Sequence, residues 1–173
     1  MGLTVRPISG AIAGAIGGAA GSYTMELFQA WWNDLEKRTA TKPAPAKAGA
    51  APKPEEEPAT VKVAERASKK LLDTGLPDDL KPAAGEAVHY AMGAATGAIY
   101  GFVAEILPPA RMFNGMLMGA IVWWTADNMA VPAQKLGKKP EQVPPSMHAY
   151  ALASHLVYGV TTELVRSVVR SIL

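Results

Sequence analysis

The sequence predicts an all-α membrane protein: a four-transmembrane-helix bundle with a long polar loop between the first and second helices. Two observations lead to this fold class. The chain of 173 residues contains four apolar segments, at 8–32, 87–107, 112–131 and 147–165. Each is about as long as a helix that rises about 1.5 Å per residue across roughly 30 Å of hydrocarbon. Most of the charged side chains (17 Lys or Arg, 15 Asp or Glu) fall instead between Asp34 and Glu86.

The alternative fold is a soluble bundle whose helices are apolar on every side. A helix on the surface of a soluble protein normally carries a polar face with a period of 3.6 residues. The stretch 116–124 reads MLMGAIVWW and has no polar side chain. This pattern favours contact with lipid.

Prolines and tryptophans mark the ends of the segments. Pro7 lies at the start of the first segment, where its missing N–H costs nothing, while Pro108 and Pro132 end the second and third. The pairs Trp31-Trp32 and Trp123-Trp124 lie near segment ends, as expected for rings that favour the headgroup region. The predicted units are a first transmembrane helix at 1–33, a soluble linker at 34–82 and a three-helix transmembrane region at 83–173.

The linker is rich in Pro, Lys and Glu and has two parts. Residues 39–58 read TATKPAPAKAGAAPKPEEEP, a composition typical of an extended spacer. Residues 61–73 place Val61, Ala64, Ala67 and Leu71 on one helical face and basic side chains on the others. This pattern predicts a short amphipathic helix, which lies either on anionic headgroups or in solvent.

Small residues recur at every fourth position in three of the segments. On a helix this spacing forms a groove that lets another backbone approach closely, as in a glycine zipper. The groove can join helices of one chain or pair two chains. The predicted helix-packing residues are Gly10, Gly14, Gly18, Gly93, Gly97, Gly101, Gly115 and Gly119.

Five ionisable groups in or beside the segments form a predicted intramembrane polar cluster. From the helical rise, most of them lie at a similar depth in a four-helix bundle. They can form structural hydrogen bonds between helices, handle protons or ions, or bind a metal. No two residues of the cluster have Glu-x-x-His or His-x-x-x-His spacing within one helix, so no metal site and no cofactor is predicted. The cluster comprises Glu26, His89, Asp127, His148 and His155.

A second group of charges lies toward the other end of the bundle. Tyr-Gly-x-x-x-Glu occurs twice, ending at Glu105 and at Glu163, which suggests a two-helix unit used twice. Arg111 and Arg166 lie near these acids. Because Glu163 and Arg166 are three residues apart on one helix, a simple interfacial ion pair explains them.

Several classes of function are excluded by composition. The net charge of +2 is too small for a nucleic-acid surface. Cysteine is absent, which removes disulfide and thiolate chemistry. Neither a catalytic triad nor a phosphate-binding loop is present, so no catalytic residue is predicted and the protein is not expected to be an enzyme.

An ordered set of motifs resembles the YagU-like family of bacterial inner-membrane proteins. It runs through residues 85–90 (GEAVHY), 97–101 (GAIYG), Trp123-Trp124, Val131-Pro132, 154–159 (SHLVYG), Glu163 and Arg166. The resemblance implies a multi-pass protein with four spans in the bacterial inner membrane. It implies no reaction, because the family is largely uncharacterised. Counting Lys and Arg favours both loops on the cytoplasmic side and both termini outside.

These observations predict a non-enzymatic structural or accessory protein. Its expected partners are the lipid bilayer and either further copies of itself or a larger membrane complex. The alternative is a small proton or ion transporter or channel that uses the polar cluster.

Overall fold

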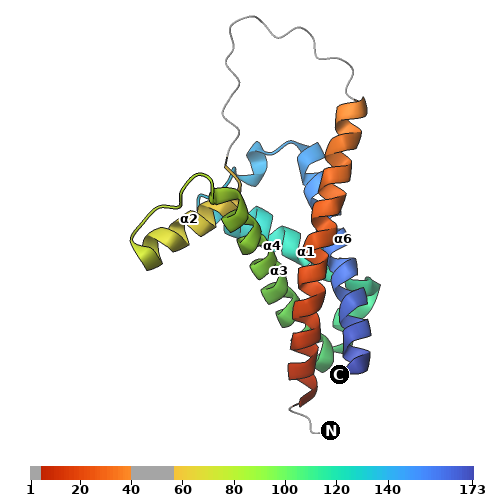
Figure 1. The fold of residues 1–173 in the computed structure, drawn as a ribbon. Coiled ribbons are helices and arrows are strands. Elements are labelled where there is room, and N and C mark those ends of the chain that lie inside the picture. Colours follow the sequence, from red (N-terminus) through yellow and green to blue (C-terminus); the bar gives the residue numbers. More distant parts are fainter. Residues whose placement is uncertain (1–4, 40–56) are drawn as a thin grey trace, which may run out of the picture.

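The computed structural model describes residues 5–39 and 57–173, and in these ranges the regular elements are all helical (Figure 1). The predicted all-α class is therefore confirmed. Helix α1 (Val5–Thr39) packs along α3 (Lys81–Ile106) and α6 (Pro145–Ile172), and α4 (Met116–Thr125) packs on α6. The start of α1 and the end of α6 lie at the same end of the bundle.

Short elements join the long helices. A 3-10 segment, η1 (Pro108–Gly115), connects α3 to α4. After α4 the chain makes a single π-helical turn, η2 (Ala126–Ala130), followed by α5 (Val131–Ala133) and the 3-10 turn η3 (Pro140–Gln142). The third predicted segment is thus divided into several pieces in the structure.

Helix α2 (Ala59–Leu72) leaves the bundle at an angle and packs on the start of α3 (Figure 1). Val61 and Ala64 are buried, whereas Leu71 is 79% exposed, so the predicted apolar face is covered only in its first half. Lys81 at the start of α3 contacts Asp78 at 2.9 Å and Glu57 at 3.2 Å. The hydrogen bond to Asp78, assisted by Glu57, raises the pKa of Lys81 above its ordinary value.

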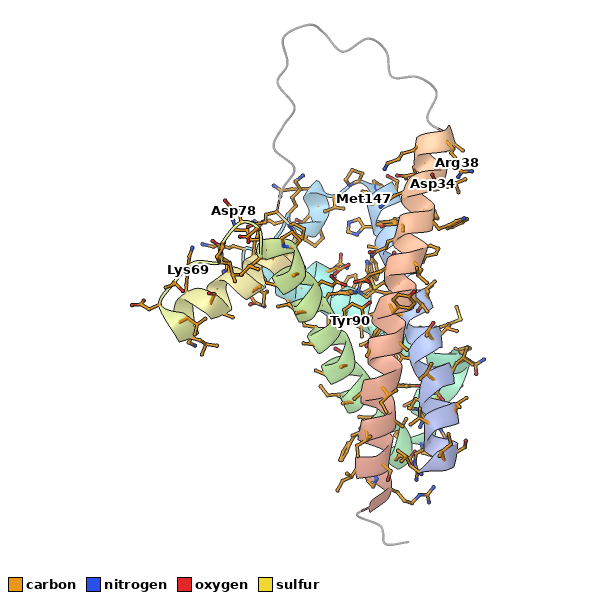
Figure 2. All side chains as sticks on the ribbon, in the orientation of Figure 1. Asp34, Arg38, Lys69, Asp78, Tyr90 and Met147 are labelled. Carbon is orange, nitrogen blue, oxygen red and sulfur yellow. The ribbon has the colours of Figure 1, made fainter. Side chains whose placement is uncertain are left out.

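Several boundaries differ from those predicted. Helix α1 continues to Thr39, beyond residue 33, and the ion pair of Asp34 with Arg38 at 2.8 Å lies on its added turns (Figure 2). Helix α6 extends to Ile172. The helix expected from residue 112 begins only at Met116, because the three residues before it, Phe113, Asn114 and Gly115, have positive φ angles. Left-handed backbone interrupts a right-handed helix.

None of the helices in the ranges 5–39 and 57–173 combines the length and the apolar composition needed to cross a membrane. The predicted transmembrane character therefore gains no support from the composition of the helices. Most of the predicted spacer, residues 40–56, lies outside the described residues.

Candidate functional site

The predicted glycines of α1 and α3 lie directly against each other in antiparallel order. Gly14 faces Gly97, Gly10 faces Gly101, and Gly18 faces Gly93. A Cβ atom at Gly14 would overlap the carbonyl oxygen of Gly97, and a Cβ atom at Gly97 would overlap that of Gly14. The two backbones are in contact, and any larger side chain at these positions would separate them.

Helix α6 contacts glycines of α1, η1 and α4 in the same way. Gly17 and Gly21 of α1 lie against Thr162, while Gly115 lies against the carbonyl oxygen of Gly159. Gly119 meets the carbonyl oxygen of His155. Gly17, Gly21 and Gly159 were not among the predicted packing residues, although Gly17 and Gly21 are themselves four residues apart.

A buried ionic network joins α3 to α6 near the end of the bundle where α6 terminates. Arg166 makes a two-pronged contact with Glu163: Nε donates to Oε2 at 2.6 Å and a terminal nitrogen donates to Oε1 at 2.8 Å. Glu163 also accepts hydrogen bonds from Tyr100 at 2.8 Å and from Ser167 at 3.0 Å. The pair is buried among the helices, because Arg166 is only 2% exposed.

Glu105 is the second acid of this network. It accepts from Nε of Arg170 at 3.0 Å and lies 3.4 Å from Arg166 and 3.8 Å from Arg6. Its side chain is 7% exposed, a position that an unpaired carboxylate would not tolerate. In the described part of the chain, the predicted member Arg111 is not among the arginines that contact either acid.

Sequence reasoning missed four members of the network: Tyr100, Ser167, Arg170 and Arg6. Tyr100 was visible as part of the repeated Tyr-Gly-x-x-x-Glu motif, and Arg170 lies one helical turn after Arg166 on the same face. No local signal links Arg6 to Glu105, because the two are far apart in the sequence.

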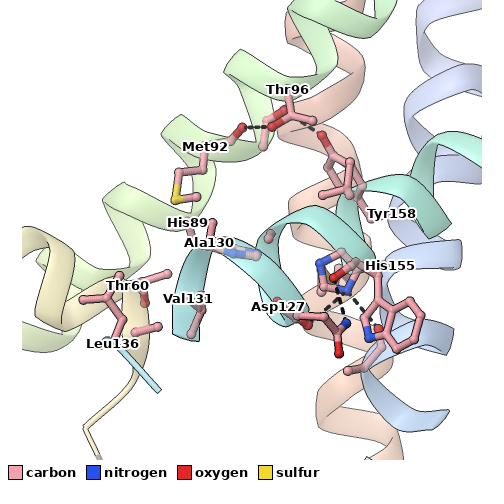
Figure 3. Close-up of a pocket in the computed structure, with 18 of the residues that line it drawn as sticks. Thr60, His89, Met92, Thr96, Asp127, Ala130, Val131, Leu136, His155 and Tyr158 are labelled. Carbon is pink, nitrogen blue, oxygen red and sulfur yellow. Dashed lines mark hydrogen bonds and ion pairs between the residues drawn. The ribbon is translucent and has the colours of Figure 1, made fainter. Parts of the chain in front are cut away.

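A cavity of about 550 Å³ lies toward the opposite end, where α2 and the segment around α5 meet the long helices. Four of the five residues of the predicted polar cluster line it, namely His89, Asp127, His148 and His155 (Figure 3). Glu26 does not. Its carboxylate accepts a hydrogen bond from Tyr90 at 2.9 Å and lies 4.0 Å from Nε2 of His89.

The cavity-lining imidazoles of α6 are tied to the backbone. Nδ1 of His155 donates to the carbonyl oxygen of Ala151 at 2.9 Å and is 3.8 Å from Oδ2 of Asp127 (Figure 3). Nε2 of His148 donates to the carbonyl oxygen of Pro140 at 3.0 Å. Among the described residues, no three His, Cys, Asp or Glu side chains are grouped closely enough to hold a metal ion.

The π turn explains how Asp127 reaches the cavity. The N–H of Val131 bonds to the carbonyl oxygen of Ala126, five residues back. Pro132, which lacks an N–H, cannot donate the next helical hydrogen bond to Asn128. Proline and the added residue of the π turn together shift the register of the helix, a distortion found often at functional sites.

Residues 74–164, more than half of the chain, match the family described as protein of unknown function (DUF1440). The chain belongs to this family. The DUF1440 region contains Glu105, Glu163 and the four residues of the polar cluster that line the cavity, whereas α1, Arg166 and Arg170 lie outside it. No curated protein and no solved structure matches the chain.

Proposed function

We propose that this DUF1440 protein is a helical bundle embedded in a membrane, where it serves as a structural or accessory component rather than as an enzyme. The observation that carries the proposal is that the long helices expose large apolar side chains along their outer surfaces, while polar and charged side chains, Arg166 among them, are buried inside the bundle. A soluble protein has the opposite arrangement, because burial of apolar surface drives its folding.

Polar side chains are among the most deeply buried in the bundle, which supports the proposal. The largest fully buried side chains are Arg166, Thr162, Ser22 and Ser154. Among the described residues, the cluster of buried apolar side chains is small, and its largest members are Tyr100, Tyr158 and two methionines. Close backbone packing and polar contacts, which hold helices together in lipid, are therefore the main internal contacts of the bundle.

The outer surface also supports the proposal, because apolar side chains recur along each long helix. These side chains are between 44% and 80% exposed, and exposed apolar surface that recurs along a helix is typical of contact with a protein or a membrane. They are Ile8, Ile12, Ile16, Leu27 and Trp31 on α1, Ile99, Phe102 and Ile106 on α3, Leu117, Ile121 and Trp124 on α4, and Leu164, Val168 and Ile172 on α6.

Under this proposal, the small residues that face α3 account for the low mean hydropathy of α1. Gly10, Gly14, Gly18 and Ser22 lower the average, and these residues face α3 rather than the surroundings. Between Arg6 and Glu26 the helix has no charged residue. The resemblance to the YagU-like family of bacterial inner-membrane proteins further supports a multi-pass location in that membrane.

An extraction experiment tests the membrane location. The full chain is expressed in a bacterium, and the membrane fraction is washed with alkaline carbonate and then with detergent. We expect the protein to stay in the pellet until detergent is added. Release by carbonate alone would contradict the proposal, because that wash removes peripheral proteins. A peripheral and an integral membrane protein of the host serve as controls.

The accessory role has a separate test. Cross-linking in native membranes, followed by detergent extraction, should give discrete products larger than the 18.2 kDa chain. Mass spectrometry then distinguishes a second copy of the chain from another membrane protein. Recovery of the monomer alone, under conditions that cross-link a known complex of the same membrane, would contradict the accessory role.

A second candidate is the passage of protons or cations, which is favoured by the shared cavity of His89, Asp127, His148 and His155. Imidazoles titrate near neutrality and can relay protons. Proteoliposomes containing the wild-type chain should then dissipate a pH gradient faster than empty vesicles, and Asp127→Asn should abolish the difference. Equal rates for wild-type and empty vesicles would exclude this function.

A further inference from the structure

The apolar face of α2 is covered in its first half and open in its second. Val61, Ala64 and Ser68 are buried where α2 packs on the start of α3. Leu71 and Leu72 continue this face, because they follow Ser68 by three and four residues. Yet they are 79% and 70% exposed. The second half of α2 thus presents two large apolar side chains that the described residues leave uncovered.

The basic side of α2 changes in the same way along the helix. Lys62 and Arg66 lie opposite the apolar face and donate to carbonyl oxygens of the loop that follows α5. Lys69 and Lys70, one turn further on, are exposed. The first half of α2 therefore contacts the bundle on both sides, whereas the second half is amphipathic and open on both sides.

The open half of α2 is a regular helix with a defined end. Oγ of Ser68 donates to the carbonyl oxygen of Thr74 at 2.9 Å, and Asp73 adopts the left-handed conformation that ends many helices. This half of α2, which carries Lys69, points away from the long helices (Figure 2). The two exposed leucines therefore lie to the side of the bundle in a fixed orientation.

The contacts of the first half set the level of α2 along the bundle. Val61 lies against Gly85 near the start of α3, and the loop that α2 contacts continues into residues 135–139, which include three lysines. Under the proposed membrane location this is a polar end of the bundle. Lipid then surrounds the outer side of α3 beyond it, where Ile99 is 67% exposed. A helix that leaves the bundle sideways at this level lies over that lipid.

The charges around the open half nearly cancel. Residues 65–81 carry four basic and four acidic side chains. Glu65 pairs with Lys69 at 3.3 Å. Asp78 pairs with Lys81 at 2.9 Å. Binding of this half to a bilayer therefore depends on its leucines more than on attraction to anionic headgroups.

We propose that the second half of α2 is an in-plane anchor, which lies in the interfacial layer of the bilayer around the bundle. Leu71 and Leu72 enter the boundary between headgroups and acyl chains, and Lys70 faces water. Apolar faces of such helices lie roughly 5–10 Å deep in this boundary. The partner is a lipid surface, neutral or anionic. The inference rests on the proposed membrane location and adds a second kind of membrane contact to it.

Spin labels at single positions test the orientation of the open half. The chain has no cysteine, so Leu72→Cys, Lys70→Cys and Ile99→Cys each give one labelled site. All three native side chains are exposed, so the labels disturb little packing. The labelled full chain is placed, one copy per disc, in nanodiscs of neutral lipid and in nanodiscs that contain anionic lipid. Electron paramagnetic resonance then measures collisions with oxygen, which concentrates in lipid, and with a water-soluble nickel chelate.

We expect the ratio of oxygen to nickel collisions to be at least about fivefold higher at residue 72 than at residue 70, on the opposite face. The ratio at residue 99 should be at least as high as that at residue 72. Neutral and anionic discs should give the same result. Leu71→Ser should lower the ratio at residue 72 by about twofold or more, because the anchor loses apolar area. The matched control is Leu80→Ser, which removes another exposed leucine outside α2 and should leave this ratio unchanged.

The three positions separate failure of the anchor from failure of the membrane location. Low ratios at residues 70 and 72, with a high ratio at residue 99, would overturn the anchor and leave the membrane location intact. Low ratios at all three positions would overturn both. Few collisions with either reagent at residue 72 would identify contact with protein. A high ratio at residue 72 in anionic discs alone would identify attraction to charged headgroups. Each of these last two results also contradicts the proposal.

Discussion

The hydroxyl of Tyr100 on α3 donates a 2.8 Å hydrogen bond to Oε2 of Glu163 on α6, the same oxygen that Nε of Arg166 contacts at 2.6 Å. This contact links the two copies of the Tyr-Gly-x-x-x-Glu motif, because the tyrosine comes from the first copy and the carboxylate from the second. Glu105, the acid of the first copy, is held by Arg166 and Arg170 of α6. The motifs thus form one network across two helices.

Tyr100→Phe should destabilise the bundle by about 1.5–3 kcal/mol, the contribution of a hydrogen bond to a charged group. The phenyl ring keeps the packing, so the loss reports the hydroxyl alone. Denaturant titration of the folded protein, followed by circular dichroism, measures the change. Tyr23→Phe is the control, because Tyr23 is 55% exposed. Equal effects of the two changes would show that the buried contact contributes nothing.

Arg166→Met should cost more, about 3–5 kcal/mol, because it leaves the carboxylate of Glu163 buried without its cation. Arg166→Lys should rescue only part of the loss, since an ammonium cannot reproduce the two-pronged geometry. A double variant, Glu163→Gln with Arg166→Met, should be more stable than Arg166→Met alone. The same denaturant titration compares the three. Arg111→Met, outside the contacts of this network, should lie within about 0.5 kcal/mol of wild type.

Gly97→Ala should separate α1 from α3, because the new methyl group would overlap the carbonyl oxygen of Gly14. Overpacking of this kind typically costs about 1–3 kcal/mol. The matched control is Gly75→Ala, where the nearest atom to a new Cβ lies at an ordinary 3.7 Å. The midpoint temperature of thermal unfolding should fall for Gly97→Ala and stay unchanged for Gly75→Ala. An unchanged midpoint for Gly97→Ala would mean that the backbones do not touch.

Helix α2 is held by two side chains that donate to carbonyl oxygens beyond α5. Nζ of Lys62 contacts the oxygen of Leu136 at 2.8 Å, and Arg66 contacts that of Gln134 at 2.9 Å. Replacing both with Met should release α2, and hydrogen exchange of its amides should accelerate about tenfold or more. Lys70→Met, at an exposed position of the same helix, should leave exchange unchanged. Unaltered protection in the double variant would mean that α2 is anchored by Val61 and Ala64 alone.

Much of the bundle could be predicted from periodicity. Glycines four residues apart lie on one helical face whatever the partner, so Gly14 and Gly97 could be assigned to packing surfaces. Which surface meets which could not be predicted, because a flat groove fits any other. The left-handed turn at 113–115 was also missed, since Phe113 has no preference for that conformation and only Gly115 signals it.

The same distinction applies to the candidate site: the depth of a residue along its helix could be predicted, whereas its partners on other helices could not. The similar depth of His89, Asp127 and His148 follows from helix length, and in the structure the three share a cavity. The burial of Glu105 could not be deduced, because its partners Arg170 and Arg6 lie on other helices. Local sequence gives the depth of a group along its helix. It gives no information about the direction from which a counter-ion approaches.

The mutual fit of Gly14 and Gly97 has one more consequence. Helix α1 lies outside the matched DUF1440 region, yet its glycines are in register with those of α3. The two surfaces fit each other by shape. We therefore expect two separately synthesised pieces of the chain, divided between α1 and α2, to reassemble.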